Sequence, residues 1–358
     1  MPTLDLTTDA VDLTVQLVDI ESVSRNEQAI ADAVEAALSE CAHLTVTRHG
    51  NTVVARTELG RGERVVIAGH LDTVPVNDNL PARRELTPEG EVLHGLGTCD
   101  MKGGDAVILR LAATVPEPNR DVTFILYEAE EIESELNGLN LLGQHAPDLM
   151  RGDFAILMEP SNAEVEAGCQ GTIRVEVRAV GERAHSARSW KGVNAIHRAA
   201  PILERLNDYR PRRPLIDGLE YHEGLNAVAI RGGVAGNVLP DECVVDVNYR
   251  FAPDRSEAEA QQFVRDLFEG YDVTVVDSAP GALPGLDRPA AKAFIEAVGR
   301  EVNPKFGWTD VARFTGLGIP AVNFGPGDPM LAHKQEEHVP VEHIERCEQQ
   351  LRDWLTSW

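Results

Sequence analysis

His70 and Asp72 are the first two residues whose types and spacing could do chemistry. They follow the apolar run 65–68 and Gly69, and this pattern predicts a buried strand that ends in a loop. Side chains two residues apart on an extended segment point to the same side, so the Asp72 carboxylate can support the His70 imidazole. A metal-bound histidine usually donates its second ring proton to such a carboxylate. An ordinary polar pair at a strand end is an equal alternative for these two residues alone.

Acidic residues follow other predicted strands in the same way. The strand predicted at 121–127 leads into Glu130 and Glu131, another strand ends directly at Glu159, and Asp100 lies in a glycine-rich turn before a predicted helix. Carboxylates gathered at strand ends repel one another unless water or a cation neutralises them. A single charge run or Gly-Asp turn is usually solvated surface. Their repetition at several strand ends favours a shared metal site.

His333 is the last candidate ligand in the chain. It ends a loop rich in glycine and proline, 324–333, which follows a short predicted strand at 321–324. Such a loop is rigid and places one histidine at a defined position, although an exposed loop histidine would have the same local sequence.

Size and composition predict two domains and exclude several classes of partner. With 358 residues and 43% hydrophobic residues, the chain exceeds the usual range of a single core. Its formal net charge of -25 argues against nucleic acid or an anionic membrane as a partner. No apolar stretch approaches about 18 residues and the N-terminus lacks a signal-peptide pattern, so we expect a cytoplasmic protein.

The five cysteines are scattered without a C-x-x-C pair, which indicates neither a disulfide framework nor a thiolate zinc site.

The chain order predicts an α/β domain interrupted by an insertion. We expect residues 1–165 and 281–358 to form one discontinuous domain and residues 166–280 to form the other. The insertion follows the order β-α-β-β-α-β of a ferredoxin-like unit. Its predicted strands are 172–179, 226–231, 242–250 and 272–276, and its predicted helices are 194–206 and 256–268.

Five motifs together resemble the co-catalytic zinc deacylase and carboxypeptidase family, which includes aminoacylases, acetylornithine deacetylases and desuccinylases. They are G-H-L-D-T-V-P at 69–75, G-x-x-D-M-K-G at 97–103, Glu130-Glu131, Met158-Glu159-Pro160 and Ala332-His333. The resemblance covers nearly the whole chain in the right order. It implies a mixed-sheet zinc-hydrolase domain, an inserted lid and dimerisation domain, a homodimer, and two Zn²⁺ ions per chain with Co²⁺ as a possible substitute.

The resemblance also implies a role for each candidate residue. Nitrogen and oxygen ligands suit zinc, and paired ions both lower the pKa of a bridging water and polarise a scissile carbonyl. A neighbouring carboxylate can take the proton of that water and pass it to the leaving amine. The implied roles are Asp100 as bridge, His70 and Glu159 on one ion, Glu131 and His333 on the other, Glu130 as general base, and Asp72 as the group that orients His70.

Within the family, segments 181–190 and 325–329 most resemble the desuccinylases of the diaminopimelate pathway. This implies hydrolysis of N-succinyl-LL-diaminopimelate to succinate and LL-diaminopimelate, with His185 reaching the active site of a partner subunit. The implied substrate contacts are Arg188, Asn237, Arg250, Thr309, Arg313 and Gly325, although each arginine could equally be a surface residue. Segment 306–313 departs from the Gly-Gly-Thr-Ser-Asp-Gly-Arg pattern of many desuccinylases, and Ile132 stands where glycine is common. Both departures leave the acyl group open.

Two other functions are therefore kept as alternatives. One is an acetylornithine deacetylase or another N-acyl-amino-acid amidohydrolase or peptidase of the same chemistry. The other is a non-catalytic binding protein that retains the fold, against which the intact Glu130 and the full set of expected ligands argue.

Overall fold

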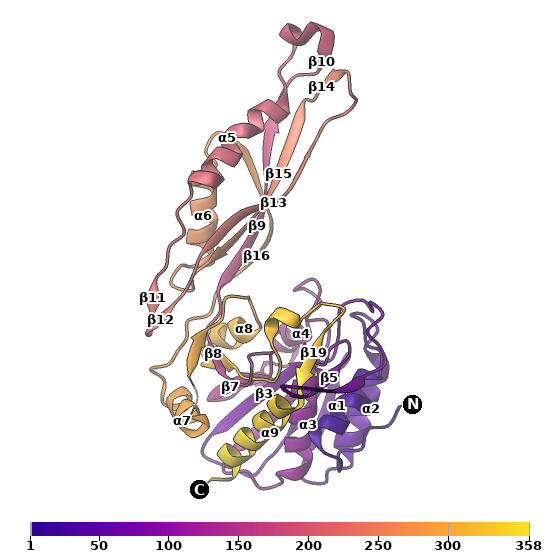
Figure 1. The fold of residues 1–358 in the computed structure, drawn as a ribbon. Coiled ribbons are helices and arrows are strands. Elements are labelled where there is room, and N and C mark those ends of the chain that lie inside the picture. Colours follow the sequence, from indigo (N-terminus) through magenta and orange to yellow (C-terminus); the bar gives the residue numbers. More distant parts are fainter. Residues whose placement is uncertain (1, 300, 358) are drawn as a thin grey trace. The chain divides into compact units, whose positions relative to one another are not determined.

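The computed structural model describes residues 2–299 and 301–357, and within them the chain divides into two compact units (Figure 1). The first unit contains the chain up to Ala167 together with 284–303 and 313–358, and the second contains 168–283 and 304–312. Segment 304–312 was expected in the first domain. It belongs to the second because the Gln170 amide donates to the Lys305 carbonyl at 3.3 Å and the Trp308 indole donates to the Pro280 carbonyl at 3.1 Å.

A mixed sheet forms the centre of the first unit. Its order within the described residues is β1-β2-β6-β3-β7-β18-β8-β17, and β6, β3, β7 and β18 run parallel. All of β6 is buried, as expected for a parallel strand with both faces covered. The strands are β1 (Thr45–His49), β2 (Thr52–Arg56), β3 (Arg64–His70), β6 (Asp121–Tyr127), β7 (Phe154–Leu157), β8 (Val165–Ala167), β17 (Val302–Pro304) and β18 (Ala321–Asn323).

Helix α3 (Lys102–Thr114) packs on β3, and α1 (Ala10–Val18) and α9 (Val341–Thr356) lie beside α3 (Figure 1). The N-cap of α1 is Asp9, because its carboxylate accepts the Asp12 amide at 2.7 Å. The other helical segments of this unit are α2 (Gln28–Ser39), α4 (Gly138–His145), η1 (Pro147–Met150), α7 (Pro289–Val298), α8 (Val311–Gly316), which begins at the boundary between the units, and η3 (Pro329–Leu331).

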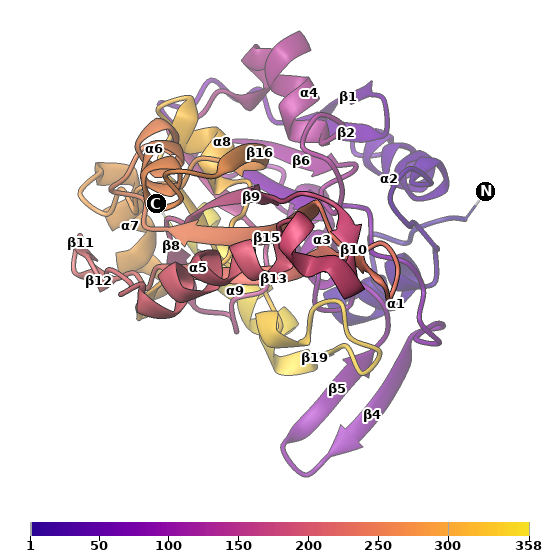
Figure 2. The same cartoon turned by 90° about the horizontal axis from the view of Figure 1, so that it is seen from above.

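A separate small sheet has the order β19-β5-β4, with β4 (Arg83–Thr87), β5 (Gly90–His94) and β19 (His338–Pro340). Figure 2 shows β4 and β5 extending from their unit as a two-stranded ribbon. Because β19 pairs with β5 from His338 to Pro340, the end of the 324–337 loop is fixed close to the turn that carries Asp100.

The second unit has the ferredoxin-like organisation expected from the sequence. Its sheet order is β13-β15-β9-β16, every neighbouring pair is antiparallel, and the elements follow the chain order β-α-β-β-α-β. Residues of β9 and β15 alternate between buried and more exposed, so one face packs on the helices. The main elements are β9 (Gly171–Val180), α5 (Ala195–Asp208), β13 (Gly224–Gly232), β15 (Glu242–Phe251), α6 (Glu257–Leu267) and β16 (Asp272–Ala279). Shorter ones are β10 (Ala184–His185), η2 (Ser186–Lys191), β11 (Leu215–Ile216), β12 (Leu219–Glu220) and β14 (Val238–Leu239).

Helices long and apolar enough to cross a lipid bilayer are absent from the described part of the chain.

Asp121 at the start of β6 provides a test of what stabilises the first unit. Its buried carboxylate accepts the Leu59 and Arg61 amides at 2.8 Å and the Thr57 hydroxyl at 2.9 Å. Burial opposes ionisation, but these hydrogen bonds outweigh it and hold the pKa of Asp121 below its usual value. We expect Asp121→Asn to lower the free energy of unfolding by roughly 2 kcal/mol at pH 7, measured by denaturant titration.

The pH dependence of that difference follows from the direction of the shift. Because the folded-state pKa of Asp121 is depressed, its contribution is complete above the unfolded pKa of about 3.9 and is lost as pH falls through the folded value. The gap between wild type and Asp121→Asn should therefore shrink in acid. A gap that stayed constant to pH 2 would contradict this account.

Candidate metal centre

His70 is the last residue of β3 and is 1% exposed. Its Nδ1 lies 3.0 Å from the Asp72 backbone carbonyl and 3.5 Å from the Asp72 carboxylate. A proton on Nδ1 satisfies the carbonyl and leaves Nε2 as the free lone pair. The Asp72 carboxylate thus lies farther from the ring than the Asp72 carbonyl does, and Nε2 is the atom available to a metal.

Asp100 offers its two carboxylate oxygens to two different histidines. Oδ1 lies 3.1 Å from His70 Nε2, and Oδ2 lies 3.4 Å from His333 Nε2. The backbone here is fixed by Glu337, whose Oε1 accepts the Cys99 amide at 2.9 Å and the Asp100 amide at 3.1 Å. A carboxylate that faces a different nitrogen with each oxygen has the geometry of a bridge between two ions.

His333 and Glu131 form the second half of the site. His333 Nε2 lies 3.0 Å from Oε1 and 2.9 Å from Oε2 of Glu131. Hydrogen bonds to Asp100 and Glu131 raise the pKa of His333 to about 10. Burial raises the pKa of Glu131, and the nearby Asp100 charge adds to that effect. The cluster therefore gathers negative charge that only a cation or protonated histidines can balance.

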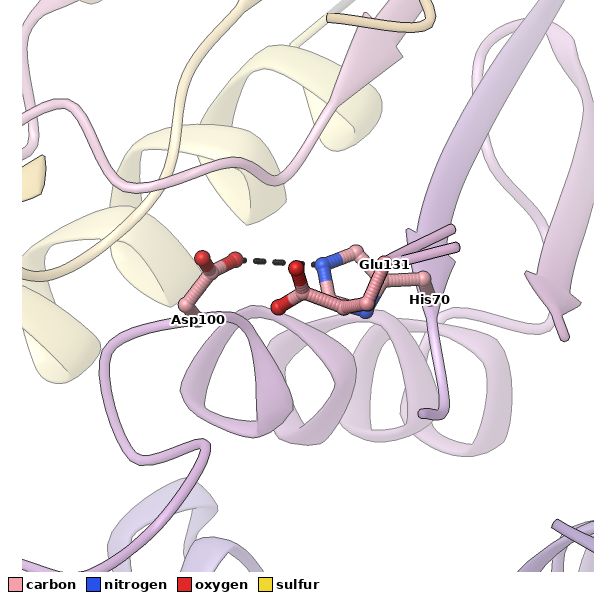
Figure 3. Close-up of side chains that lie close together, drawn as sticks. All are labelled: His70, Asp100 and Glu131. Atoms are coloured by element: carbon pink, nitrogen blue, oxygen red, sulfur yellow. Dashed lines mark hydrogen bonds and ion pairs between the residues drawn. The ribbon is translucent and has the colours of Figure 1, made fainter. Parts of the chain in front are cut away.

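The donor set fits a metal ion. Ligand atoms of His70, Asp100 and Glu131 all lie within 4.8 Å of one another (Figure 3). Ligands bound at 2.0–2.1 Å in tetrahedral geometry are separated by about 3.3 Å, close to the nitrogen–oxygen distances found here. Burial alone would lower the pKa of His70, yet Asp100 and Asp72 raise it well above its usual value. A cation between these groups would take the place of that ring proton.

Glu159 was expected as a further ligand. It follows β7, the strand next to β3, so both strands end on the same edge of the sheet. It is 6% exposed. Among the described residues, the group close enough to share one ion consists of His70, Asp100 and Glu131. His333 contacts Asp100 and Glu131, so four of the five predicted ligands come together, and Glu159 follows the end of the neighbouring strand.

The turn after β6 carries Glu130 and is tied to Asp72. The Glu130 amide donates to Asp72 Oδ1 at 3.0 Å, and the Glu131 amide donates to Oδ2 at 3.2 Å. The Ser24 hydroxyl donates to the same Oδ2 at 2.7 Å. Asp72 was expected only to orient His70, but it also fixes the backbone of the turn that carries Glu130 and Glu131.

In the second unit, His185 and Asn237 come together although the sequence treats them separately. His185 in β10 pairs with Val238 in β14, and the Ser186 amide donates to the Asn237 carbonyl at 2.9 Å. His185 Nδ1 accepts the Ala187 amide at 3.1 Å. With Nδ1 as an acceptor, the neutral ring carries its proton on Nε2, so His185 presents a hydrogen-bond donor.

The other predicted substrate contacts lie in different surroundings. Arg188 is exposed in η2, Arg250 is half-buried in β15, and Thr309 is buried in segment 304–312. Burial lowers the pKa of Arg250, against the attraction of Asp277.

Arg313 and Gly325 belong to the first unit. Arg313 donates to the Ser134 hydroxyl at 3.0 Å, which links α8 to the loop after Glu131. Gly325 packs so tightly that a Cβ there would overlap the Met158 carbonyl, next to Glu159. The packing thus explains why glycine is needed at 325, independently of any substrate contact.

Sequence reasoning missed Glu337 as a part of this site. It is 1% exposed and binds the backbone that carries Asp100, but nothing local distinguishes it from Glu336 beside it. The pairing of β19 with β5 is what directs its side chain, and only the fold reveals that pairing.

The sequence of this chain matches a known protein family. The model of the Peptidase family M20/M25/M40 matches residues 66–357. The chain belongs to this peptidase family. Among its M20 relatives, a putative succinyl-diaminopimelate desuccinylase of Mycobacterium tuberculosis is 56% identical over 355 residues, covering 98% of this chain and 99% of that protein. A succinyl-diaminopimelate desuccinylase of Corynebacterium glutamicum is 46% identical over 367 residues, covering 99% and 98%.

Solved structures show the M20 fold as well. An M20 family metallo-carboxypeptidase of Sulfolobus solfataricus superposes with a TM-score of 0.79 at 16% identity, covering 97% of this chain and 98% of that one. The predicted α/β fold with an inserted α+β domain is confirmed.

Proposed function

We propose that this M20 enzyme hydrolyses the amide bond of N-succinyl-LL-diaminopimelate and releases succinate and LL-diaminopimelate. The main support for this substrate is the 56% identity, over 98% of the chain, to a protein named a putative succinyl-diaminopimelate desuccinylase. The cluster of His70, Asp100, Glu131 and His333 supports hydrolysis, since these potential ligands lie close together at the sheet edge, from the buried His70 to the exposed His333. This reaction belongs to lysine and diaminopimelate biosynthesis, and we propose a cytoplasmic location on that ground.

We propose that the site holds two Zn²⁺ ions, for which Co²⁺ could substitute. Asp100 would bridge them, His70 and Glu159 would complete one side, and Glu131 and His333 the other. The two-ion arrangement is supported by the Asp100 carboxylate, because one of its oxygens faces His70 and the other faces His333. The bound ions would supply an acidified water and a polarised carbonyl.

Glu130 is the proposed general base. It follows the positive-φ residue Ala129, and its amide is held by Asp72 at 3.0 Å. A carboxylate next to a ligand, without being one, can accept a proton at the attacking oxygen and deliver it to the leaving nitrogen. Hydrolysis consumes one water molecule: its oxygen becomes part of the released carboxylate, and its proton passes through Glu130 to the released amine.

We propose a homodimer that forms through the second unit. β13 lies at the edge of its sheet, and Val228 and Ile230 on this strand are 60% and 52% exposed. An open edge strand with apolar side chains is suited to pairing with a second copy. In this proposal His185 stabilises the oxyanion at the partner's site, which its Nε2–H donor supports.

Substrate carboxylates would be bound by arginines. Guanidinium groups bind carboxylates with two parallel hydrogen bonds. Arg250 is the first candidate because it is half-buried on a strand. The remaining proposed contacts are Arg188, Asn237, Thr309, Arg313 and Gly325.

The substrate is tested by a panel of N-acyl compounds at equal concentration. N-succinyl-LL-diaminopimelate should release amine faster than N-acetylornithine, which lacks both the succinyl carboxylate and the second α-carboxylate of diaminopimelate. It should also release amine faster than simple dipeptides, which lack the succinyl carboxylate. Faster release from N-acetylornithine would replace the proposed substrate with the alternative one. Lack of release from every compound by the zinc-loaded protein would favour the non-catalytic alternative.

Metal content is the next expected result. Five ligands are too many for one tetrahedral ion and suit a bridged pair. Metal analysis of the saturated protein should approach two zinc ions per chain, and exhaustive chelation should remove activity. Saturation at one ion per chain would contradict the bridged pair.

A further inference from the structure

Glu27 is a buried carboxylate near the metal centre that no role considered so far includes. It is 0% exposed, and its Oε1 accepts the Ala129 amide at 3.2 Å and the Arg25 amide at 2.9 Å. Ala129 immediately precedes Glu130. Glu27 therefore binds the turn after β6 from a segment about a hundred positions earlier in the chain.

The turn that Glu27 binds has an unfavourable backbone conformation. Ala129 has a φ of 58°, in the left-handed region, which a residue with a Cβ rarely adopts. Such a conformation persists only when neighbouring groups hold it. Three successive amides are held here, since Glu27 accepts from Ala129 while Asp72 accepts from Glu130 and Glu131.

Helix capping does not explain Glu27. It occupies the N-cap position of α2, yet its side chain makes no capping hydrogen bond to that helix. Its other oxygen, Oε2, has no hydrogen-bond partner among the described residues. The hydrogen bonds of this carboxylate are thus made by Oε1, which accepts from the Arg25 and Ala129 amides. Ala129 is the donor that is remote in the sequence, and it lies in the turn before Glu130.

We propose that Glu27 is a positioning residue for the reaction: by holding the Ala129 amide it fixes the conformation from which Glu130 and Glu131 project. The effect on turnover rests on the proposed function, whereas the effect on the turn does not. Groups that orient metal ligands and catalytic side chains typically contribute 10–100-fold in activity or metal affinity.

The test compares two replacements of similar size. Glu27→Gln keeps an oxygen acceptor, whereas Glu27→Met fills the space without one. We expect Glu27→Met to lower kcat by about 10–100-fold with KM little changed, and Glu27→Gln to remain within about 3-fold of wild type, since one neutral acceptor replaces another. Asp121→Asn is the matched control, because Asp121 also binds loop amides but at the opposite end of β6.

Amide hydrogen exchange of the metal-free protein gives a readout independent of substrate and metal. Glu27→Met should accelerate exchange at Ala129, Glu130 and Glu131, while Glu27→Gln and Asp121→Asn should not. Unchanged exchange at these amides in folded Glu27→Met would overturn the proposal. A loss of kcat equal in Glu27→Gln and Glu27→Met, or shared by Asp121→Asn, would also overturn it. Faster exchange without any turnover in wild type would instead refute the proposed function.

Discussion

Glu130→Gln is expected to lower kcat by at least ~100-fold, the scale of lost general base catalysis. Glutamine has the shape of glutamate but cannot accept the proton from the attacking water. Because the Glu130 amide, not its side chain, is bound by Asp72, the turn should keep its conformation. Zinc content should therefore stay near the wild-type value, as measured by metal analysis alongside steady-state kinetics.

Glu131→Gln is the matched control for that experiment. Glu131 faces His333 with both oxygens, so its replacement should weaken the binding of one zinc ion. If Glu130→Gln removes metal or leaves kcat unchanged, the roles of the two neighbours are wrongly assigned.

His185→Ala should lower kcat by ~10²–10³, the usual contribution of a positioned oxyanion donor. The expectation that His185 acts on the partner subunit gives a sharper experiment. The variants Glu130→Ala and His185→Ala, each nearly inactive, are mixed under conditions that exchange subunits. The mixed dimer then contains one site with an intact Glu130 and an intact partner His185, and activity should return.

The opposite outcome of this mixing experiment is equally clear. If His185 acts within its own chain, each site of the mixed dimer keeps one lesion and activity stays absent. Subunit exchange must be verified independently, for example by native mass spectrometry of differently tagged chains. Verified exchange without recovered activity would refute a site shared between subunits.

The sequence predicted those parts of the site that depend on strand ends. The apolar runs before His70, Glu130 and Glu159 are parallel strands in the structure, and the parallel arrangement brings their ends to one edge. The alternation and helix signals of 166–280 likewise predicted the ferredoxin-like sheet, because local periodicity determines which face is buried.

The sequence did not predict the contacts that hold the loops carrying the candidate metal ligands. Glu27 and Glu337 bind the backbones that carry Glu130 and Asp100 from segments remote in the chain. Backbone amides have no sequence signature, so such contacts appear only in the fold. Segment 304–312 was misplaced for the same reason, since its hydrogen bonds to Gln170 and Pro280 join distant residues.

The most direct test of the central claim is turnover of N-succinyl-LL-diaminopimelate before chelation, after chelation, and after zinc is returned. Succinate and free amine are measured together in each state. We predict equal amounts of both products from the zinc-loaded protein, none after exhaustive chelation, and recovery when zinc is restored. Undiminished product release by the chelated protein, or the absence of succinate release from the protein containing two zinc ions per chain, would contradict metal-dependent desuccinylation.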